Sequence, residues 1–183
     1  MSKVSTSHAA VDLPPVLGVC GWSGSGKTSL IERLLPVFAE AGLRVNVVKH
    51  SHHAPTLEPA GKDTARFRAA GAHEVMLASP WGVAIMSEAR GAQQAPLNAL
   101  LARLAPADLI LVEGFKHEAI PRLEVWRAAT GKPLLAATDS GIIAVASDSH
   151  PECDVPLVDL DDTIAVASFI LQTLGIDHGA ISA

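Results

Sequence analysis

The sequence has few cysteines, few charged residues and no long apolar run, and each shortage excludes a class of protein. The two cysteines among its 183 residues, Cys20 and Cys153, lie far apart and show no Cys-x-x-Cys spacing. Neither a disulfide framework nor a zinc site is therefore expected. A reducing cytoplasm is the simpler setting for such a chain, and we predict a cytoplasmic protein.

Charged residues make up 18% of the chain, and the formal net charge is -5. Since no overall positive charge attracts nucleic acid, nucleic acid is not an expected partner, and any affinity for phosphate must be local. Residues 1–15 are polar and rich in serine, which predicts neither a signal peptide nor a membrane span. We expect a flexible arm over residues 1–15, a single domain over residues 16–183 and no membrane partner.

The stretch Gly-Trp-Ser-Gly-Ser-Gly-Lys-Thr has the form G-x-x-x-x-G-K-[ST], which is typical of a phosphate-binding P-loop. An apolar run before it predicts a buried strand, and apolar residues at helical spacing after it predict a helix. The glycines allow successive backbone N–H groups to point at phosphate oxygens, at the positive end of the helix dipole. Nucleotide binding is therefore assigned to Gly21, Trp22, Ser23, Gly24, Ser25, Gly26, Lys27, Thr28 and Ser29.

Strand and helix patterns along the rest of the chain predict an α/β fold. Residues 44–50 alternate and are rich in β-branched side chains, so they predict a strand that completes a βαβ unit with residues 16–20. Such a unit implies a parallel sheet. The expected fold is P-loop NTPase-like, a mostly parallel sheet flanked by helices. Further strands are expected at 108–112, 122–127 and 142–146, and helices at 27–41, 61–70, 95–104 and 161–174.

Two strand-like runs, 74–79 and 83–88, are joined by Pro80-Trp81-Gly82 and predict an inserted β-hairpin. Both arms of this hairpin are apolar. Their side chains are covered either by packing within the chain or by pairing across a two-fold axis, so a homodimer is one of two expectations.

Two acidic residues are candidates for Mg²⁺. Glu113 ends an apolar strand, where it can hold Mg²⁺ directly or through water, together with the Thr28 hydroxyl. The alternative is a solvated glutamate at a strand end. Asp63 is a second candidate and lies in Gly61-Lys62-Asp63-Thr64, a stretch that is either a second phosphate-binding patch or a solvated helical face.

Histidines and lysines suggest contacts to a second ligand. His50, His52 and His53 follow the second strand, and three imidazoles can ligate a transition metal, but adjacent residues of a strand point to opposite faces. Alternatively, this loop contacts an anionic ligand through neutral histidines that donate hydrogen bonds. A further cation, Lys116, follows Glu113 closely and is either a γ-phosphate contact or a surface lysine. Candidate contacts are therefore His50, His53, Lys62 and Lys116.

Asp148 follows the last apolar strand, where its carboxylate can accept hydrogen bonds from guanine N1 and N2. This is a loose analogue of an N-K-x-D element, because the Asn and Lys are missing. Asp139 is a rival for the same role, and a turn-capping aspartate is the plain alternative.

Four motifs in this order and spacing resemble the molybdopterin-guanine dinucleotide biosynthesis adapter proteins (MobB-like), over about residues 16–148. The motifs are G-W-S-G-S-G-K-T, K-H-S-H-H, G-K-D-T with R-x-R and A-G-A, and L-V-E-G-F-K-H-E followed by I-P-R-L-E-V. The resemblance implies a GTP-binding P-loop protein, usually dimeric and slow in hydrolysis, that assists the MobA-like nucleotidyltransferase joining GMP to molybdopterin. It places Mg²⁺ at Thr28 and Glu113. Trp22 stands where MinD-like relatives carry an extra lysine, so that lysine device is absent.

Three functions stay open. The first is a GTP-binding accessory protein whose enzymatic activity is at most slow GTP hydrolysis, because no glutamine or arginine is obviously placed to assist the attacking water. No catalytic residue is assigned. The second is a small-molecule kinase or ATP-dependent ligase, for which no acceptor site is evident. The third is a nickel-insertion GTPase, suggested by the histidines but lacking a paired cysteine motif.

Overall fold

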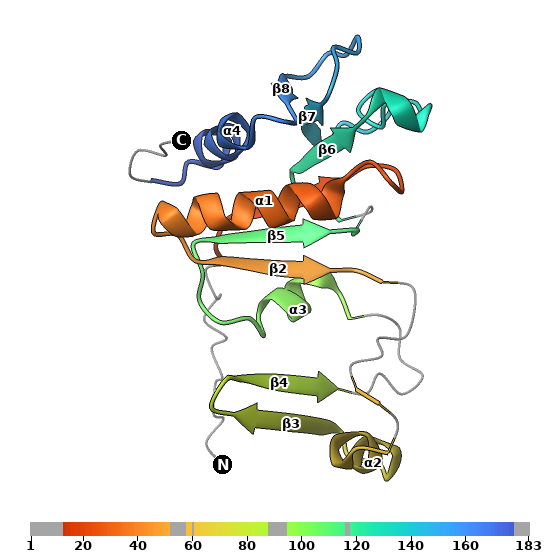
Figure 1. Ribbon diagram of the computed structural model, residues 1–183, viewed down its shortest axis with the longest axis vertical. Helices are drawn as coiled ribbons and strands as arrows, with labels where there is room; N and C mark the ends of the chain where they lie inside the picture. The colour runs from red at the N-terminus through yellow and green to blue at the C-terminus, as the bar shows by residue number, and fades with distance from the viewer. Residues whose placement is uncertain (1–12, 52–57, 60, 88–94, 116–117, 178–183) are drawn as a thin grey trace, which may run out of the picture. The chain divides into compact units, whose positions relative to one another are not determined.

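The computed structural model describes residues 13–51, 58–59, 61–87, 95–115 and 118–177 (Figure 1). Contacts divide the chain into two compact units, Met1–His50 with Leu100–Ala183, and Ser51–Ala99. Most of the arm expected over residues 1–15 falls outside the described residues, and the single domain expected over residues 16–183 stays a prediction.

One six-stranded sheet forms the centre of the first unit (Figure 1). All neighbouring strands are parallel, which confirms the parallel sheet expected from the sequence. In spatial order the strands are β2 (Val45–Lys49), β5 (Leu109–Glu113), β1 (Val16–Cys20), β6 (Arg122–Trp126), β7 (Ile142–Ser147) and β8 (Leu157–Asp159).

Two features of the sheet were not part of the sequence prediction. β1 and β2 are not neighbours, because β5 lies between them and pairs with both. β8 was not expected, since a strand of 3 residues is too short to show an alternating pattern. It adds to the edge of the sheet beside β7, where Ala146 pairs with Val158.

Two helices cover one face of this sheet. α1 (Lys27–Glu40) and α4 (Thr163–Leu174) contact each other, and both bury an apolar side against the strands. Every second residue of the inner strands faces them, as the pleat requires. The core consists of Leu17, Val19, Leu30, Ile31, Leu34, Phe38, Leu109, Leu111, Leu123, Val125, Ala144, Ala146, Leu160, Val166, Ala167, Ile170 and Leu171.

Local sequence sets the ends of α4. The Asp162 side chain accepts a hydrogen bond of 2.8 Å from the Ala165 N–H, which satisfies one of the free amides of the first turn. Gly175 ends the helix in the left-handed conformation.

Two short helical segments complete the description. α3 (Leu97–Leu101) is shorter than the helix expected over residues 95–104. A 3₁₀ turn, η1 (Ala128–Thr130), follows β6.

The second unit contains α2 (Asp63–Ala69) and an antiparallel hairpin of β3 (Glu74–Ser79) and β4 (Gly82–Ser87). The structure thus confirms the inserted hairpin. Val75 pairs with Met86, and both are buried. The opposite hairpin face is exposed: Met76, Val83 and Ile85 are 62%, 64% and 54% exposed.

The carboxyl ends of the parallel strands meet at one edge of the sheet. Figure 1 shows the arrowheads of β2 and β5 at the end where α1 begins. Ligands of open α/β sheets bind at this edge. Within the described ranges, no helix has the length and apolar character needed to cross a bilayer.

Candidate functional site

The P-loop connects β1 to α1 and requires glycine at its first position. Gly21 has φ +136°, and a Cβ built there would lie 2.3 Å from the Val125 carbonyl oxygen and 2.8 Å from the Ser25 hydroxyl. Both distances are too short for any side chain. Directly before α1, Gly26 also has positive φ, at +98°. The loop therefore has the tight backbone path that brings successive amides to one concave side.

The ammonium group of Lys27 lies over this loop. Lys27 Nζ donates hydrogen bonds to the carbonyl oxygens of Gly21 at 3.0 Å and Trp22 at 2.9 Å. A positive charge is thus held at the first turn of α1, where the helix dipole already favours an anion. A polyphosphate fits this arrangement, because both the backbone and the lysine offer donors at one place.

Thr28 and Glu113 come together although they lie on different elements. The Thr28 hydroxyl is 3.3 Å and 3.2 Å from Glu113 Oε1 and Oε2. Glu113 is the last residue of β5, beside Val19 of β1 on one side and Lys49 of β2 on the other. Lys49 Nζ also lies 3.4 Å from Glu113 Oε2. The structure thus brings together the two residues expected to hold Mg²⁺ next to the P-loop.

The donor chemistry of this pair fits Mg²⁺. A hydroxyl and a carboxylate are hard oxygen ligands, and Mg²⁺ in nucleotide sites commonly takes one or two protein oxygens, with phosphate oxygens and water completing its shell. The part of the chain that the structure describes contains no cluster of three or more His, Cys, Asp or Glu suited to a metal. A magnesium ion here would depend on the nucleotide for its remaining ligands.

His50 lies beside the same strand end. Its backbone N–H donates to the Glu113 carbonyl oxygen at 2.8 Å, and its ring packs on that of Phe115 with the centroids 4.8 Å apart. His53 and Lys116, two other expected contacts, lie outside the described residues. His50 is therefore near the Mg²⁺ candidates, although its ring is occupied by an aromatic neighbour.

Lys62 and Asp63 belong to the second unit, whereas the P-loop belongs to the first. Asp63 begins α2, and its side chain is 81% exposed and forms an ion pair of 3.5 Å with Arg66. This geometry matches a solvated helical face, and the expected magnesium and phosphate contacts of these two residues stay predictions.

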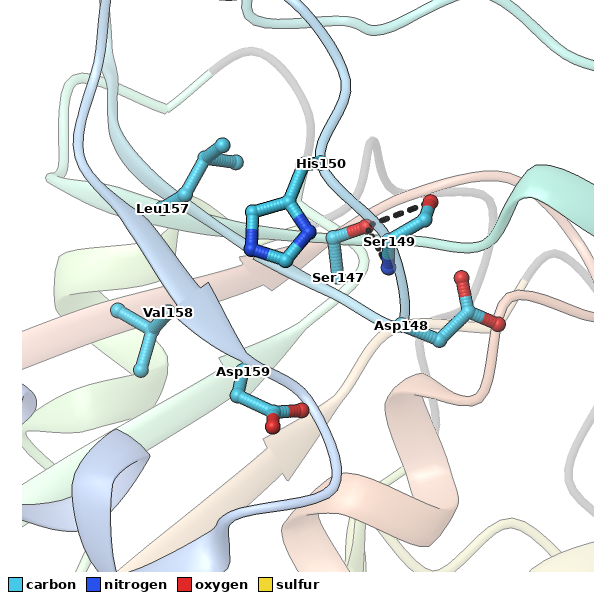
Figure 2. A pocket seen from close by; sticks show the side chains of 7 residues that line it. All are labelled: Ser147, Asp148, Ser149, His150, Leu157, Val158 and Asp159. Atoms are coloured by element: carbon cyan, nitrogen blue, oxygen red, sulfur yellow. Dashed lines mark hydrogen bonds between the residues drawn. The ribbon is translucent and has the colours of Figure 1, made fainter.

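Asp148 lies at the carboxyl end of β7, on the same edge of the sheet. Its Oδ2 accepts from Arg127 Nη1 at 3.1 Å, and its Oδ1 accepts from the Ala128 N–H at 3.3 Å. Next to it a pocket of about 210 Å³ opens, and Figure 2 shows the Asp148 carboxylate pointing away from the His150 ring. The lining residues are Ser147, Asp148, Ser149, His150, Leu157, Val158 and Asp159. The rival residue, Asp139, is instead paired with Arg122 and Gly141.

Comparison with known proteins identifies the family. Residues 16–148 match the family model described as "Molybdopterin guanine dinucleotide synthesis protein B" (MobB). The chain belongs to the MobB family. A molybdopterin-guanine dinucleotide biosynthesis adapter protein of Escherichia coli (strain K12) is 37% identical over 168 residues, which cover 90% of this chain and 96% of that protein. A protein of the same description from Haemophilus influenzae is 40% identical over 166 residues, covering 91% and 93%.

Solved MobB structures share the fold. A crystal structure of molybdopterin-guanine biosynthesis protein B superposes with a TM-score of 0.70 at 31% identity, covering 87% of this chain and 99% of that one. The crystal structure of Bacillus subtilis MobB superposes with a TM-score of 0.67 at 25% identity, covering 86% and 96%. These matches confirm the P-loop NTPase-like fold class expected from the sequence.

One side of the P-loop of this MobB chain is bounded by the segment 127–136, which sequence reasoning missed. The Trp22 indole N–H donates to the Pro133 carbonyl oxygen at 2.8 Å, and the Trp126 indole N–H donates to that of Lys132 at 2.8 Å. The Lys132 ammonium lies 5.8 Å from the centre of the Trp22 ring. Trp22, a P-loop residue of no fixed type in the motif, therefore ties the loop to this segment.

Glu124 holds the far end of the same segment. Its side chain is completely buried, and its two carboxylate oxygens accept hydrogen bonds of 2.8 Å from the N–H groups of Leu135 and Ala136. Burial raises the pKa of the Glu124 carboxyl, and the two backbone hydrogen bonds oppose that shift. The alternation of residues 122–127 marks Glu124 as a strand residue, but no sequence signal reveals these partners.

Cys20 ends β1 directly before the P-loop. Burial raises the pKa of its thiol to about 12, and the nearby Glu124 carboxylate adds to the shift. The thiol therefore stays protonated, which removes it from the candidates for a nucleophile or a metal ligand.

Proposed function

We propose that this protein is a GTP-binding adapter in the attachment of GMP to molybdopterin, the step that forms the guanine dinucleotide of the molybdenum cofactor. The observation that carries the proposal is the Thr28–Glu113 pair beside the Lys27-covered P-loop, in a chain whose MobB match spans residues 16–148. The relatives from Escherichia coli and Haemophilus influenzae are named as adapters of this pathway.

The nucleotide lies along the carboxyl edge of the sheet. Its phosphates bind to residues 21–29, with Lys27 moving from the loop carbonyls to phosphate oxygens, which satisfy its donors better because they are charged. Thr28 and Glu113 would hold Mg²⁺ next to the P-loop, where the ion would offset the negative charge of the phosphates. The guanine lies at Asp148, whose carboxylate accepts from N1 and N2, next to the pocket of about 210 Å³.

Any GTP hydrolysis by the protein alone is slow. Fast GTPases place a glutamine or an equivalent residue against the attacking water. Among the described residues the glutamine is Gln172, and it lies in the last turn of α4, whereas the first turn of that helix is the end near the P-loop edge. In an adapter, the bound nucleotide can serve to stabilise one conformation of the protein or to promote its binding to a partner.

The hairpin of β3 and β4 is the proposed homodimer element. A two-stranded sheet is marginally stable by itself, and one face of this hairpin presents Met76, Val83 and Ile85 to solvent. A second copy that covers this face would bury apolar area and stabilise both hairpins.

We place the protein in the cytoplasm. Cys20 and Cys153 are free thiols, which suits a reducing compartment.

The test is a pull-down with the MobA-like nucleotidyltransferase, with and without GTP and Mg²⁺. We expect the protein to associate with the enzyme or to stimulate formation of the guanine dinucleotide, and we expect Lys27→Ala to lose the GTP-dependent part. A protein that neither binds nor stimulates that enzyme under any nucleotide condition is not its adapter.

A further inference from the structure

Arg127 lies against the P-loop, although no sequence motif includes it. It follows β6, and a Cβ built on Gly26 would lie 3.4 Å from Arg127 Nε and 4.0 Å from Nη2. The guanidinium therefore lies alongside the residue that precedes Lys27, at the start of α1. The Val125 carbonyl approaches Gly21 in the same way, so the end of β6 runs close to the loop over several residues.

Two carboxylates fix the guanidinium in this place. Arg127 Nη1 lies 3.1 Å from Asp148 Oδ2, and Nη2 lies 3.7 Å from Asp161 Oδ1. Asp148 follows β7 and Asp161 follows β8, so the arginine is held from the ends of the next two strands of the sheet. The Nε–H, which is the donor nearest Gly26, has no acceptor among the described residues. The Nε–H edge of the forked guanidinium group is thus left for a ligand.

The loop itself supplies a second donor that lacks a protein acceptor. Ser25 is 1% exposed, and its hydroxyl has no hydrogen-bond partner in the described part of the chain. Buried polar atoms of this kind are rare in folded proteins, because leaving them unpaired costs free energy. The Arg127 Nε–H and the Ser25 hydroxyl both lie at the short loop between Gly21 and Lys27, which indicates a ligand with several acceptor oxygens.

We propose that Arg127 is a phosphate-binding residue that the chain supplies to its own P-loop. Its Nε–H edge binds an oxygen of a nucleoside di- or triphosphate beside Gly26, and Asp148 and Asp161 are positioning residues that hold the fork. An arginine held by carboxylates keeps its planar geometry, so little rotamer freedom is lost when the anion binds. The inference rests on the proposed function, because it needs nucleotide in the P-loop.

The test compares Arg127→Gln with Arg44→Gln as the matched control. Arg44 pairs with Asp108 at the opposite, amino edge of the sheet, so its removal leaves the site intact. GTP and ATP affinities are measured by calorimetry with Mg²⁺. We expect Arg127→Gln to weaken both nucleotides about 10-fold to 100-fold, with the GTP-to-ATP preference unchanged because the contact is to phosphate, and Arg44→Gln to bind like the wild type.

The outcomes separate the two proposals. Wild-type protein that fails to bind GTP removes the proposed function, and Arg127 with it. If the wild type binds GTP, two results for Arg127→Gln overturn only the inference. One is full affinity for both nucleotides, and the other is a shifted base preference in place of a general loss of affinity. If Arg127→Gln does not fold, Arg127→Lys decides, since it keeps the charge near both carboxylates but lacks the fork. Weakened GTP binding in that variant supports the contact, and unchanged binding refutes it.

Discussion

The Thr28 hydroxyl and the Glu113 carboxylate lie 3.3 Å and 3.2 Å apart at their two contacts, although 85 residues separate them in the sequence. The parallel pairing of β1 with β5 brings them together, because it sets Val19 opposite Glu113 just before the P-loop begins. One strand register thus positions the acidic residue against the first turn of α1.

Glu113→Gln should weaken the dependence of GTP binding on Mg²⁺. The substitution keeps the size of the side chain but removes the charge that attracts the cation, so the apparent Mg²⁺ affinity should fall about 10-fold to 100-fold, the range found when a supporting carboxylate of a metal site is lost. Titration of Mg²⁺ against GTP-bound protein measures the change. Asp108→Asn, at the amino edge of the sheet, is the control, and equal Mg²⁺ dependence in both variants would remove Glu113 from the site.

Asp148→Asn should shift base preference from GTP toward XTP. A carboxylate accepts from both guanine N1–H and the N2 amino group, whereas an asparagine amide donates and therefore suits the additional oxygen of xanthine. Competition between the two nucleotides, measured on wild type and variant, gives the ratio directly. An identical ratio in the two proteins would mean that Asp148 only positions Arg127.

The free energy of unfolding of the wild type should fall, relative to that of Glu124→Gln, as pH rises through the acid range. The pKa of Glu124 is raised in the folded state, so its contribution to stability is fully present below the unfolded pKa of about 4.3 and is lost as pH rises through the folded pKa. Urea unfolding of both proteins from about pH 4, near the unfolded pKa of a glutamate, up to about pH 8 measures the difference. A gap that stays constant with pH would contradict the raised pKa.

Cys20 should resist alkylation in the native protein, while Cys153 reacts. The Cys20 thiol is buried and has a pKa of about 12, so the reactive thiolate is scarce at pH 8, which is roughly the pKa of an ordinary thiol. Mass spectrometry after iodoacetamide treatment should locate the label at Cys153 alone, with Cys153→Ser remaining unlabelled until denaturant is added. Early labelling of Cys20 would show that the strand end before the P-loop is open.

Local patterns predicted the parts of this fold that depend on local chemistry. The P-loop, the hairpin around Pro80-Trp81-Gly82 and the strand ending at Glu113 all carry signals within a few residues, and the structure has them at nearly the expected bounds. The position of β5 between β1 and β2 and the short β8 were not predictable in this way, because strand order depends on contacts between distant segments.

The candidate site likewise contains residues that local motifs predicted and one residue that they did not. Lys27, Thr28 and Glu113 belong to motifs, so the sequence suggested them, and strand pairing then brought them together. Arg127 escaped notice because an arginine after a strand is ordinary in sequence. Its proposed role at the P-loop follows only from its contacts with Gly26, Asp148 and Asp161, which lie near it in space.

Calorimetric titration of GTP with Mg²⁺ into the wild-type protein and Lys27→Ala tests the central claim most directly. Lys27 supplies the charge above the P-loop, so we expect clear binding by the wild type and none by the variant, with circular dichroism showing that both are folded. Absence of GTP binding by the folded wild type, or equal affinity in the two proteins, would contradict the account.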